Sequence, residues 1–199
     1  MKPILFNTEM VKAILNGTKT QTRRLVKGLP LYSPYFEVVD GAPMVCDDNG
    51  DWYPATAFSR IQPGDVLWVR ETWHGIKTGN EKFGHHKTFW YKADEKDDNP
   101  DDKWRPSIHM PKEAARLFLR VKSVRIERLQ DMTPDECIND GGFTREAVNL
   151  LGIAPLFGAL WDNTLKSADI PKYGWFANPW VWVIEFERVD REDVTDEYE

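Results

Sequence analysis

The sequence predicts an α+β fold. Three segments, at residues 66–70, 117–126 and 180–189, are rich in the β-branched and aromatic residues that favour strands. Helix signals occur at residues 8–16 and then gather between residues 133 and 167. We therefore expect a strand-rich protein with one helix near its N-terminus and a group of helices in its last third.

The first elements are a short strand and a helix. Residues 2–6 are partly apolar and suit a strand, and Asn7 or Thr8 can cap the helix that follows. Gly17 supplies the glycine that commonly ends a helix. The apolar residues in between recur at helical spacing, and they are Met10, Val11, Ile14 and Leu15. This helix is expected to cover residues 8–16.

Polar regions flank the next strand on both sides. A turn at residues 47–51, Asp-Asp-Asn-Gly-Asp, predicts a hairpin between strands at residues 38–46 and 52–58. Residues 66–70 read as a central strand, because they are apolar on both faces until Arg70. Residues 75–87 are rich in Gly, Lys and His and are expected to be a mobile loop.

The last third holds the remaining helices and the closing strand. Thr133 and Glu136 form a capping box, which predicts a helix start with Pro134 at the first helical position. Thr144 marks a second start, and a third helix is expected from about residue 155. Residues 180–189 then close the sheet.

Charge and length restrict the class of protein. The 199 residues fit one domain. The net charge of −6 argues against a general nucleic-acid coat protein. The charge is segregated, however, since residues 103–128 carry eight cations and two anions, whereas residues 185–199 carry eight anions and two cations. Both a basic surface on an acidic protein and charges scattered for solubility are compatible with this pattern.

Metal and membrane signals are weak. Cys46 and Cys137 belong to no CxxC or CxxH pattern, and His85 and His86 have no obvious third ligand, so neither a metal nor a cofactor is predicted. No segment approaches the roughly 20 apolar residues that cross a bilayer. We expect a cytoplasmic protein with reduced thiols and no membrane partner, in an oligomeric state that the sequence leaves open.

One polar stretch has the residue types of a binding or catalytic site. Residues 17–24, Gly-Thr-Lys-Thr-Gln-Thr-Arg-Arg, place hydroxyls between cations directly after the first helix. Such groups suit a core poorly, because each needs a partner when buried. The stretch is either an anion or nucleotide site or a solvated turn with an edge strand. Arg70 and Glu71 follow the central strand, where they either line a cleft or form a structural ion pair.

Four motifs in this order resemble the ASCH domain of the PUA-like superfamily, and especially the longer ASCH proteins of bacteriophages and prophages. They are residues 17–24 after the first helix, residues 63–73 (PGDVLWVRETW), residues 104–111 (WRPSIHMP) and residues 178–183 (NPWVWV). The resemblance implies a small, strongly curved β-barrel with flanking helices. It also implies a single domain over residues 1–199, with insertions at about residues 27–62 and 75–103.

The resemblance further implies a function related to RNA. Members of the superfamily bind RNA or, as small ASCH enzymes, hydrolyse N4-acetylcytidine to cytidine and acetate. In these enzymes the pattern Lys-Thr-x-Thr-x-Arg supplies a catalytic Lys and Thr, which match Lys19 and Thr22, with Arg24 at the Arg position. A further acid, normally Glu, follows the later helix, and Asp140 is its best match.

The chemistry of these residues suits an amidohydrolase that removes an acyl group from N4-acylated cytidine. The Thr22 hydroxyl would attack the amide, and Lys19 can remove its proton only if the pKa of Lys19 falls below about 10.4. Arg23 and Arg24, which are close to Lys19 in the sequence, act in that direction. Either Asp140 or Glu71 is expected to orient Lys19 or to carry a proton.

The same residues also explain simple binding of a nucleoside, a nucleotide or RNA. Contacts to this partner are expected from Thr20, Arg23, Arg24, Arg70 and Trp73. A non-catalytic RNA-binding module and a ribonuclease that uses no metal therefore remain as alternatives.

Overall fold

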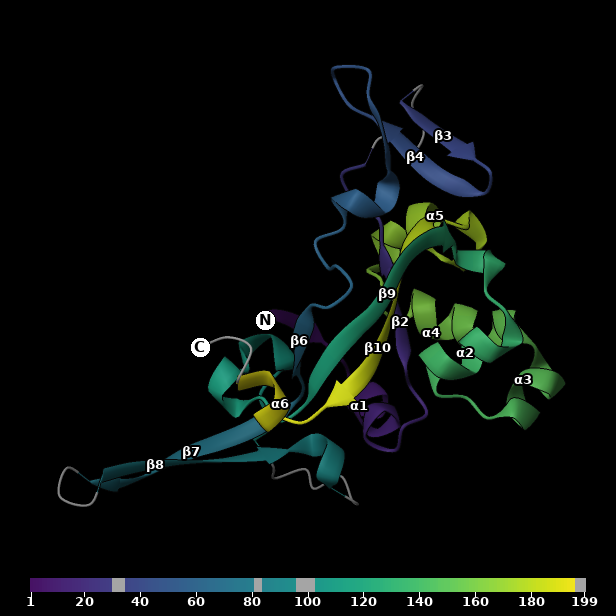
Figure 1. Cartoon of the computed structure of the whole chain (residues 1–199). Coiled ribbons are helices and arrows are strands. Elements are labelled where there is room, and N and C mark those ends of the chain that lie inside the picture. The colour runs from purple at the N-terminus through teal and green to yellow at the C-terminus, as the bar shows by residue number, and fades with distance from the viewer. Residues whose placement is uncertain (30–34, 81–83, 96–102, 196–199) are drawn as a thin grey trace. The chain divides into compact units, whose positions relative to one another are not determined.

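The computed structural model describes residues 1–29, 35–80, 84–95 and 103–195, so both predicted insertions are described only in part (Figure 1). Helices and strands are mixed along the chain, which confirms the α+β class. Clustering of contacts divides the chain into two compact units. Unit 1 comprises Met1–Gly17, Asp65–Arg120 and Glu187–Glu199, and unit 2 comprises Thr18–Gly64 and Val121–Phe186. The prediction of a single domain stays a prediction.

Unit 1 is built on three strands and one helix. Strand β1 (Lys2–Leu5) pairs in parallel with β6 (Val66–Arg70), which pairs antiparallel with the start of β9 (Phe118–Arg128). Helix α1 (Thr8–Leu15) begins as predicted, because the Asn7 side chain accepts a hydrogen bond from the Met10 amide at 2.8 Å. The core of this unit comprises Val66, Trp68, Trp73, Met110, Ala114, Ala115, Phe118 and Val194.

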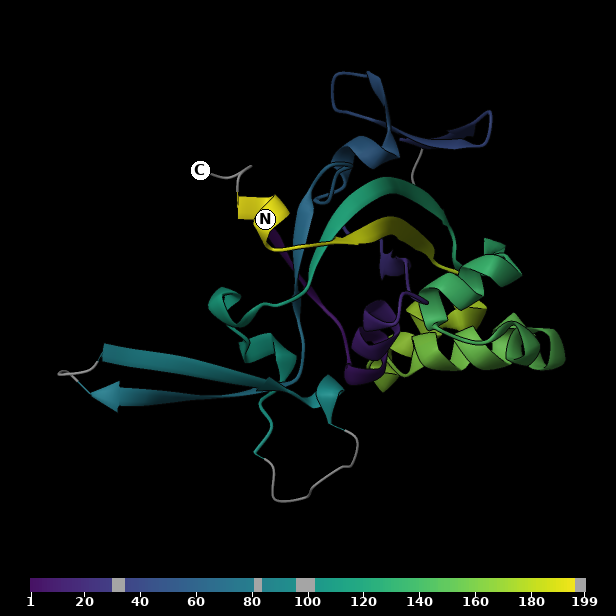
Figure 2. The same cartoon turned by 60° about the horizontal axis from the view of Figure 1, so that its bottom comes forward.

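A long hairpin replaces the mobile loop expected at residues 75–87, so that prediction is wrong. Strands β7 (Trp73–Asn80) and β8 (Gly84–Tyr91) pair antiparallel along their whole length (Figures 1 and 2). The rings of Trp73 and Phe89 meet edge to face, 5.8 Å apart, near the base. Main-chain pairing explains how a segment poor in apolar residues becomes a hairpin. Short helical turns complete unit 1 at Lys92–Asp94, Ser107–His109, Lys112–Ala114 and α6 (Glu192–Thr195).

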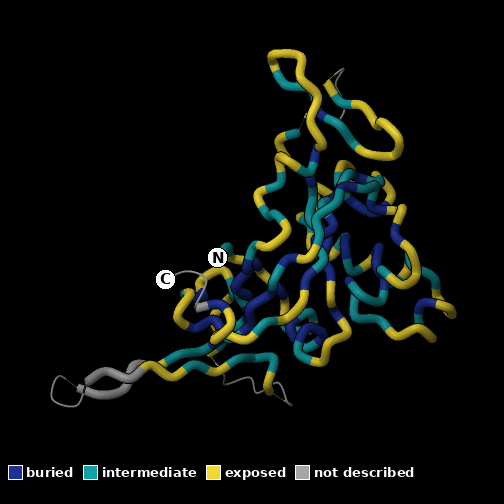
Figure 3. Tube along the Cα trace, viewed as in Figure 1, coloured by how far each residue is buried: buried dark blue, intermediate teal, exposed yellow. Residues whose placement is uncertain are grey.

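Unit 2 places a helical layer against strands. Strand β10 (Trp180–Val189) lies between β9 and β2 (Gln21–Leu25), and it pairs antiparallel with β2. Buried residues follow β2 and β10 and the inner sides of the helices (Figure 3). The helices are α2 (Pro134–Gly141), α3 (Arg145–Leu151), α4 (Ala159–Asp162) and α5 (Ile170–Tyr173), with a π turn at Ala154–Gly158 and 3-10 turns at Leu129–Asp131, Ser167–Asp169 and Trp175–Ala177.

The start of α2 confirms the predicted capping box. The Thr133 hydroxyl accepts from the Glu136 amide at 3.3 Å, and the Glu136 carboxylate accepts from the Thr133 amide at 2.8 Å. Gly142, with a left-handed φ of 70°, ends the helix. The position of Asp140 near the end of α2 therefore depends on local signals at both ends of the helix.

A three-stranded sheet occupies the first predicted insertion. Its strands are β3 (Phe36–Val39), β4 (Ala42–Cys46) and β5 (Trp52–Pro54), and a 3-10 turn at Ala55–Phe58 follows. The single strand expected at residues 38–46 is wrong, because Asp40 (φ 50°) and Gly41 (φ 79°) form a two-residue turn inside it. Asp-Gly is a strong hairpin signal for this reason. The predicted turn at residues 47–51 is confirmed by the pairing of β4 with β5.

The sheets formed by the described residues do not close into a barrel. None of the helices in the described ranges combines the length and apolar character that a membrane span requires.

Candidate functional site

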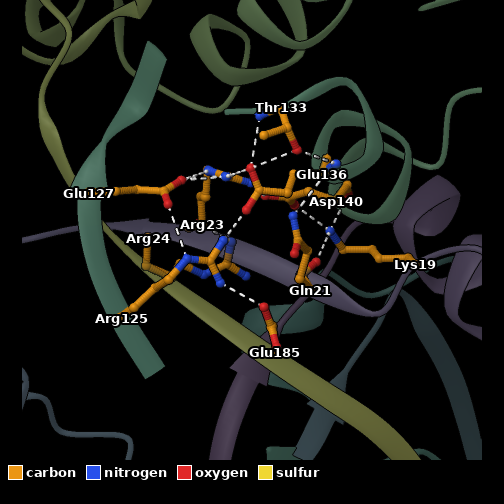
Figure 4. Close-up of polar contacts among 10 residues, drawn as sticks. All are labelled: Lys19, Gln21, Arg23, Arg24, Arg125, Glu127, Thr133, Glu136, Asp140 and Glu185. Carbon is orange, nitrogen blue, oxygen red and sulfur yellow. Dashed lines mark hydrogen bonds and ion pairs between the residues drawn. The ribbon is translucent and has the colours of Figure 1, made fainter. Parts of the chain in front are cut away.

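Lys19 lies buried in unit 2 with its ammonium against the end of α2. The side chain is 0 % exposed, and Nζ donates to Asp140 Oδ1 at 2.7 Å (Figure 4). It also donates to the main-chain oxygen of Gln21 at 2.8 Å and to that of Asp140. These acceptors match the three donors of an ammonium group.

Local structure brings the two partners together. The Thr20 amide donates to the Asn139 carbonyl at 2.9 Å, which ties the residue before β2 to the end of α2. The Phe186 amide donates to the Thr20 carbonyl at 2.8 Å, so β10 holds the same residue from its other side. Asp140, beside Asn139, is thereby fixed next to Lys19.

Arg23 shares Asp140 with Lys19. Its side chain is 0 % exposed, and Nη1 donates to Asp140 Oδ2 at 3.2 Å. Its Nε donates to Glu127 Oε1 at 3.1 Å, and Nη2 lies 3.4 Å from Glu136 Oε2. The Asp140 carboxylate therefore bridges two buried cations through its two oxygens.

Arg125 extends these contacts toward the surface of unit 2. Its Nε donates to Glu127 Oε2 at 3.1 Å, its Nη1 to Glu185 Oε1 at 2.6 Å, and its Nη2 to Glu136 (Figure 4). We call the connected side chains the buried charge network. Its members are Lys19, Arg23, Arg125, Glu127, Glu136, Asp140 and Glu185.

Sequence reasoning missed most of this network. The sequence indicates Glu136 only as a cap and Arg125 only as part of a strand, and Glu127 lies just beyond that predicted strand. The two-residue spacing of Arg125 and Glu127 on β9 does place both on one face of the strand. Arg23, which pairs with Glu127, is however 104 positions away from it in the sequence, and no local pattern indicates such a contact.

The site lowers the pKa of Lys19 below its ordinary value of 10.5. Burial is the largest cause, the Asp140 carboxylate opposes it, and Arg24 and Arg23 add to the lowering. The two arginines thus act in the predicted direction, but desolvation dominates. Burial likewise lowers the pKa of Arg24, which Asp140 again opposes.

Thr22 is buried, at 1 % exposure. Strand alternation turns its side chain to the face opposite Gln21 and Arg23. The Gln21 carbonyl that accepts from Lys19 belongs to the peptide group joining Gln21 to Thr22. The ammonium is therefore held next to the main chain of Thr22. Thr20 is exposed, so the two threonines differ in burial.

Glu71 lies in unit 1 and forms a structural ion pair there. At 1 % exposure, it accepts from Arg116 Nε at 2.9 Å and from Arg116 Nη2 at 3.0 Å. Arg116 also binds Asp94 and stacks 3.9 Å from the centre of the Tyr91 ring. Burial raises the pKa of Glu71, and Arg116 opposes the shift. Of the two acids expected to orient Lys19, the structure brings Asp140 to it.

Arg70 and Trp73 also belong to unit 1. Arg70 donates through Nη2 to the Ile108 carbonyl and lies 5.5 Å from the centre of the Trp68 ring. Trp73 is 5 % exposed, within the core of this unit, and Arg105 lies 5.2 Å from its ring centre. The predicted site residues in unit 2 are Lys19, Thr20, Thr22, Arg23, Arg24 and Asp140.

Within the described ranges, no group of three or more His, Cys, Asp and Glu residues is placed to hold a metal ion. The side chains of His85 and His86 lie outside the described set. Compared with protein-family models, with curated proteins and with solved structures, the chain gives no match, so its resemblance to ASCH domains depends on the four sequence motifs alone.

Proposed function

We propose that the chain is a PUA-like ASCH protein that removes an acyl group from N4-acylated cytidine. The observation that carries the proposal is Lys19, whose pKa is lowered by burial and whose ammonium is held between Asp140 and the peptide group of Thr22. A desolvated lysine of this kind is suited to act as a general base beside a hydroxyl nucleophile.

The proposed reaction requires the Thr22 hydroxyl to reach Lys19 Nζ when substrate is bound, because in the structure Nζ contacts the Gln21 carbonyl and Asp140. Neutral Lys19 removes the proton of the Thr22 hydroxyl as its oxygen bonds to the acyl carbon. The bond from that carbon to N4 breaks, and N4 receives the proton from Lys19, which releases cytidine. Water then attacks the threonine ester, Lys19 takes a proton from it, and the carboxylic acid leaves as Thr22 regains its hydroxyl proton.

Asp140 and Arg24 have supporting roles in this proposal. Asp140 keeps Lys19 Nζ in position and raises its affinity for a proton, which counters the effect of burial. The main-chain N–H groups near Thr22, or the guanidinium of Arg24, are the donors available for the oxyanion.

Binding without catalysis is the second candidate, and a specific observation favours it. The Asp140 carboxylate and the Lys19 ammonium are each held by several partners, and the Thr22 side chain faces away from the side of β2 that carries Arg23. A fully paired cluster of this kind is equally suited to shaping a nucleotide or RNA site. A ribonuclease that uses no metal is the third alternative.

The test is release of cytidine from N4-acetylcytidine, followed by chromatography. We expect turnover by the wild type and a loss of about 100-fold or more in Thr22→Val and in Lys19→Arg, which keeps the charge but not the base. Thr22→Ser should retain part of the activity. Thr88→Val, which removes an exposed hydroxyl from β8 in unit 1, is the matched control, and circular dichroism verifies folding.

The other outcomes distinguish the candidates. Inactive wild type that binds cytidine-containing RNA in fluorescence anisotropy would support the binding module, and cleavage of that RNA would support the nuclease. Equal turnover by Thr22→Val and wild type would remove Thr22 as the nucleophile.

A further inference from the structure

We propose that one face of the β3–β5 sheet, the face that carries Val39 and Trp52, is a docking surface for a cationic, partly apolar segment of a protein partner. This inference concerns a part of unit 2 that the proposed reaction does not use.

One face of this sheet is covered by its own unit at Phe36 and Val45, whereas Val38 (52 % exposed) and Tyr53 (41 % exposed) on the same face stay accessible. Phe36, Val45 and Tyr53 are aligned across the three strands, so their side chains share a face. Val45 is 3 % exposed, and the Phe36 ring meets Trp180 edge to face at 5.4 Å. Val26 and Ile126 belong to the same core cluster. This face anchors the sheet on β2, β9 and β10.

The opposite face is apolar and exposed. Register places Cys46 opposite Trp52 and Val39 opposite Ala42, on the face that alternates with Val45. Trp52 is 41 % exposed and Val39 is 48 % exposed. An exposed tryptophan beside other exposed apolar residues is typical of an interaction site, and Glu37 lies on the same face.

Charge identifies the kind of partner. Residues 36–59 contain five carboxylates and no Lys, Arg or His. The carboxylates stand in β3 and in the turns at both ends of the strands, and they are Glu37, Asp40, Asp47, Asp48 and Asp51. Figure 3 shows these turns as exposed chain. A cationic segment would be attracted to such a surface and steered to it.

The same charge argues against other occupants. Nucleic acid would bring phosphates toward five carboxylates, which is unfavourable. A second copy of the chain docked through the same face would place five carboxylates against five others. A protein segment with Lys or Arg beside apolar residues would bury the exposed Trp52 under its apolar residues and pair its cations with the carboxylates of the turns.

The experiment uses two synthetic peptides of equal length, one of Lys and Leu and one of Glu and Leu, titrated into the full chain. We expect the cationic peptide to bind in calorimetry, with NMR shifts confined to residues 36–58. Binding should weaken about tenfold or more in Trp52→Ser. It should also weaken in a triple variant with Asn at residues 47, 48 and 51, and with added salt. Phe176→Ser, which removes a 90 % exposed aromatic elsewhere in unit 2, is the matched control.

Several results would overturn the proposal. These are no binding of the cationic peptide, equal binding of the anionic one, or the same affinity in Trp52→Ser and Phe176→Ser. Dimerisation in sedimentation that Trp52→Ser abolishes would assign the face to self-association. Turnover of N4-acetylcytidine should be unchanged in Trp52→Ser, so failure of the docking proposal is separable from failure of the proposed function.

Discussion

Asp140 neutralises two buried cations at once. Its Oδ1 accepts from Lys19 and its Oδ2 from Arg23, and both cationic side chains are 0 % exposed. Removing Asp140 takes away the carboxylate that Lys19 contacts and one of the three that Arg23 contacts, which costs far more than losing a surface pair.

We expect Asp140→Asn to lower the free energy of unfolding by about 3–5 kcal/mol, measured by urea denaturation. The amide keeps the shape of the side chain but removes the negative charge. Asp135→Asn in the same helix is the control, because its side chain is 69 % exposed and pairs only with the exposed Arg145 side chain in the described part of the chain. That change should cost no more than about 1 kcal/mol. Equal costs would contradict the role of Asp140.

Lys19 should make stability rise with pH. Its pKa is lowered in the folded chain, so between that pKa and 10.5 the unfolded chain binds more protons than the folded one. The contribution is present in full above 10.5 and is lost as the pH falls through the folded-state pKa. The measurement is the difference in unfolding free energy between wild type and Lys19→Met across this window. A difference that does not change with pH would contradict the lowered pKa.

At the scale of elements, unit 2 depends on close contact between a helical turn and a tryptophan. Gly158 ends the π turn before α4, and a methyl group on it would lie 2.9 Å from Trp175 Cγ. Trp175 in turn meets Phe157 edge to face at 6.4 Å and belongs to the core of this unit. The glycine is therefore required by packing rather than by its backbone conformation.

We expect Gly158→Ala to destabilise the chain by about 1–3 kcal/mol, because Trp175 must shift to make room. The near-ultraviolet circular dichroism of the aromatic residues should change with it. Ala159→Ser, at the exposed next position, should stay within about 0.5 kcal/mol of wild type in the same denaturation assay. A neutral Gly158→Ala would show that the core adapts without cost.

At the scale of the whole molecule, the two cysteines report on the opening of unit 2, where both lie. Cys46 is partly exposed, whereas Cys137 is 0 % exposed and burial raises its pKa to about 11, with a further contribution from Asp140. The thiolate is the reactive form. Cys137 is therefore protected from reagents both by its burial and by its raised pKa, which keeps the thiol protonated.

We expect one thiol to react with an aromatic disulfide reagent at pH 8 in the folded protein and the second only after unfolding. Peptide mapping should find the early label on Cys46, and Cys46→Ser should abolish the fast phase. Rapid labelling of both cysteines would mean that the helical core opens readily.

Local signals in the sequence predicted much of the fold and part of the site. Asn7 and the capping box of Thr133 and Glu136 fixed two helix starts, because a cap acts over three or four residues. Asp40-Gly41 is a further local signal, and it predicts a turn inside residues 38–46. The hairpin gives no such signal over residues 75–87, since its pairing there depends on main-chain contacts in a segment rich in Gly, Lys and His.

The sequence by itself determined the mixed fold class, the position of Lys19 and Thr22 after the first helix, and the placement of Asp140 near a helix end. Only the tertiary structure decided which groups meet. Lys19 and Asp140 are 121 positions apart, and their contact follows from how β2 packs on α2. The lowered pKa of Lys19 is likewise a tertiary property, because desolvation arises from the residues that surround a side chain and not from its neighbours in sequence.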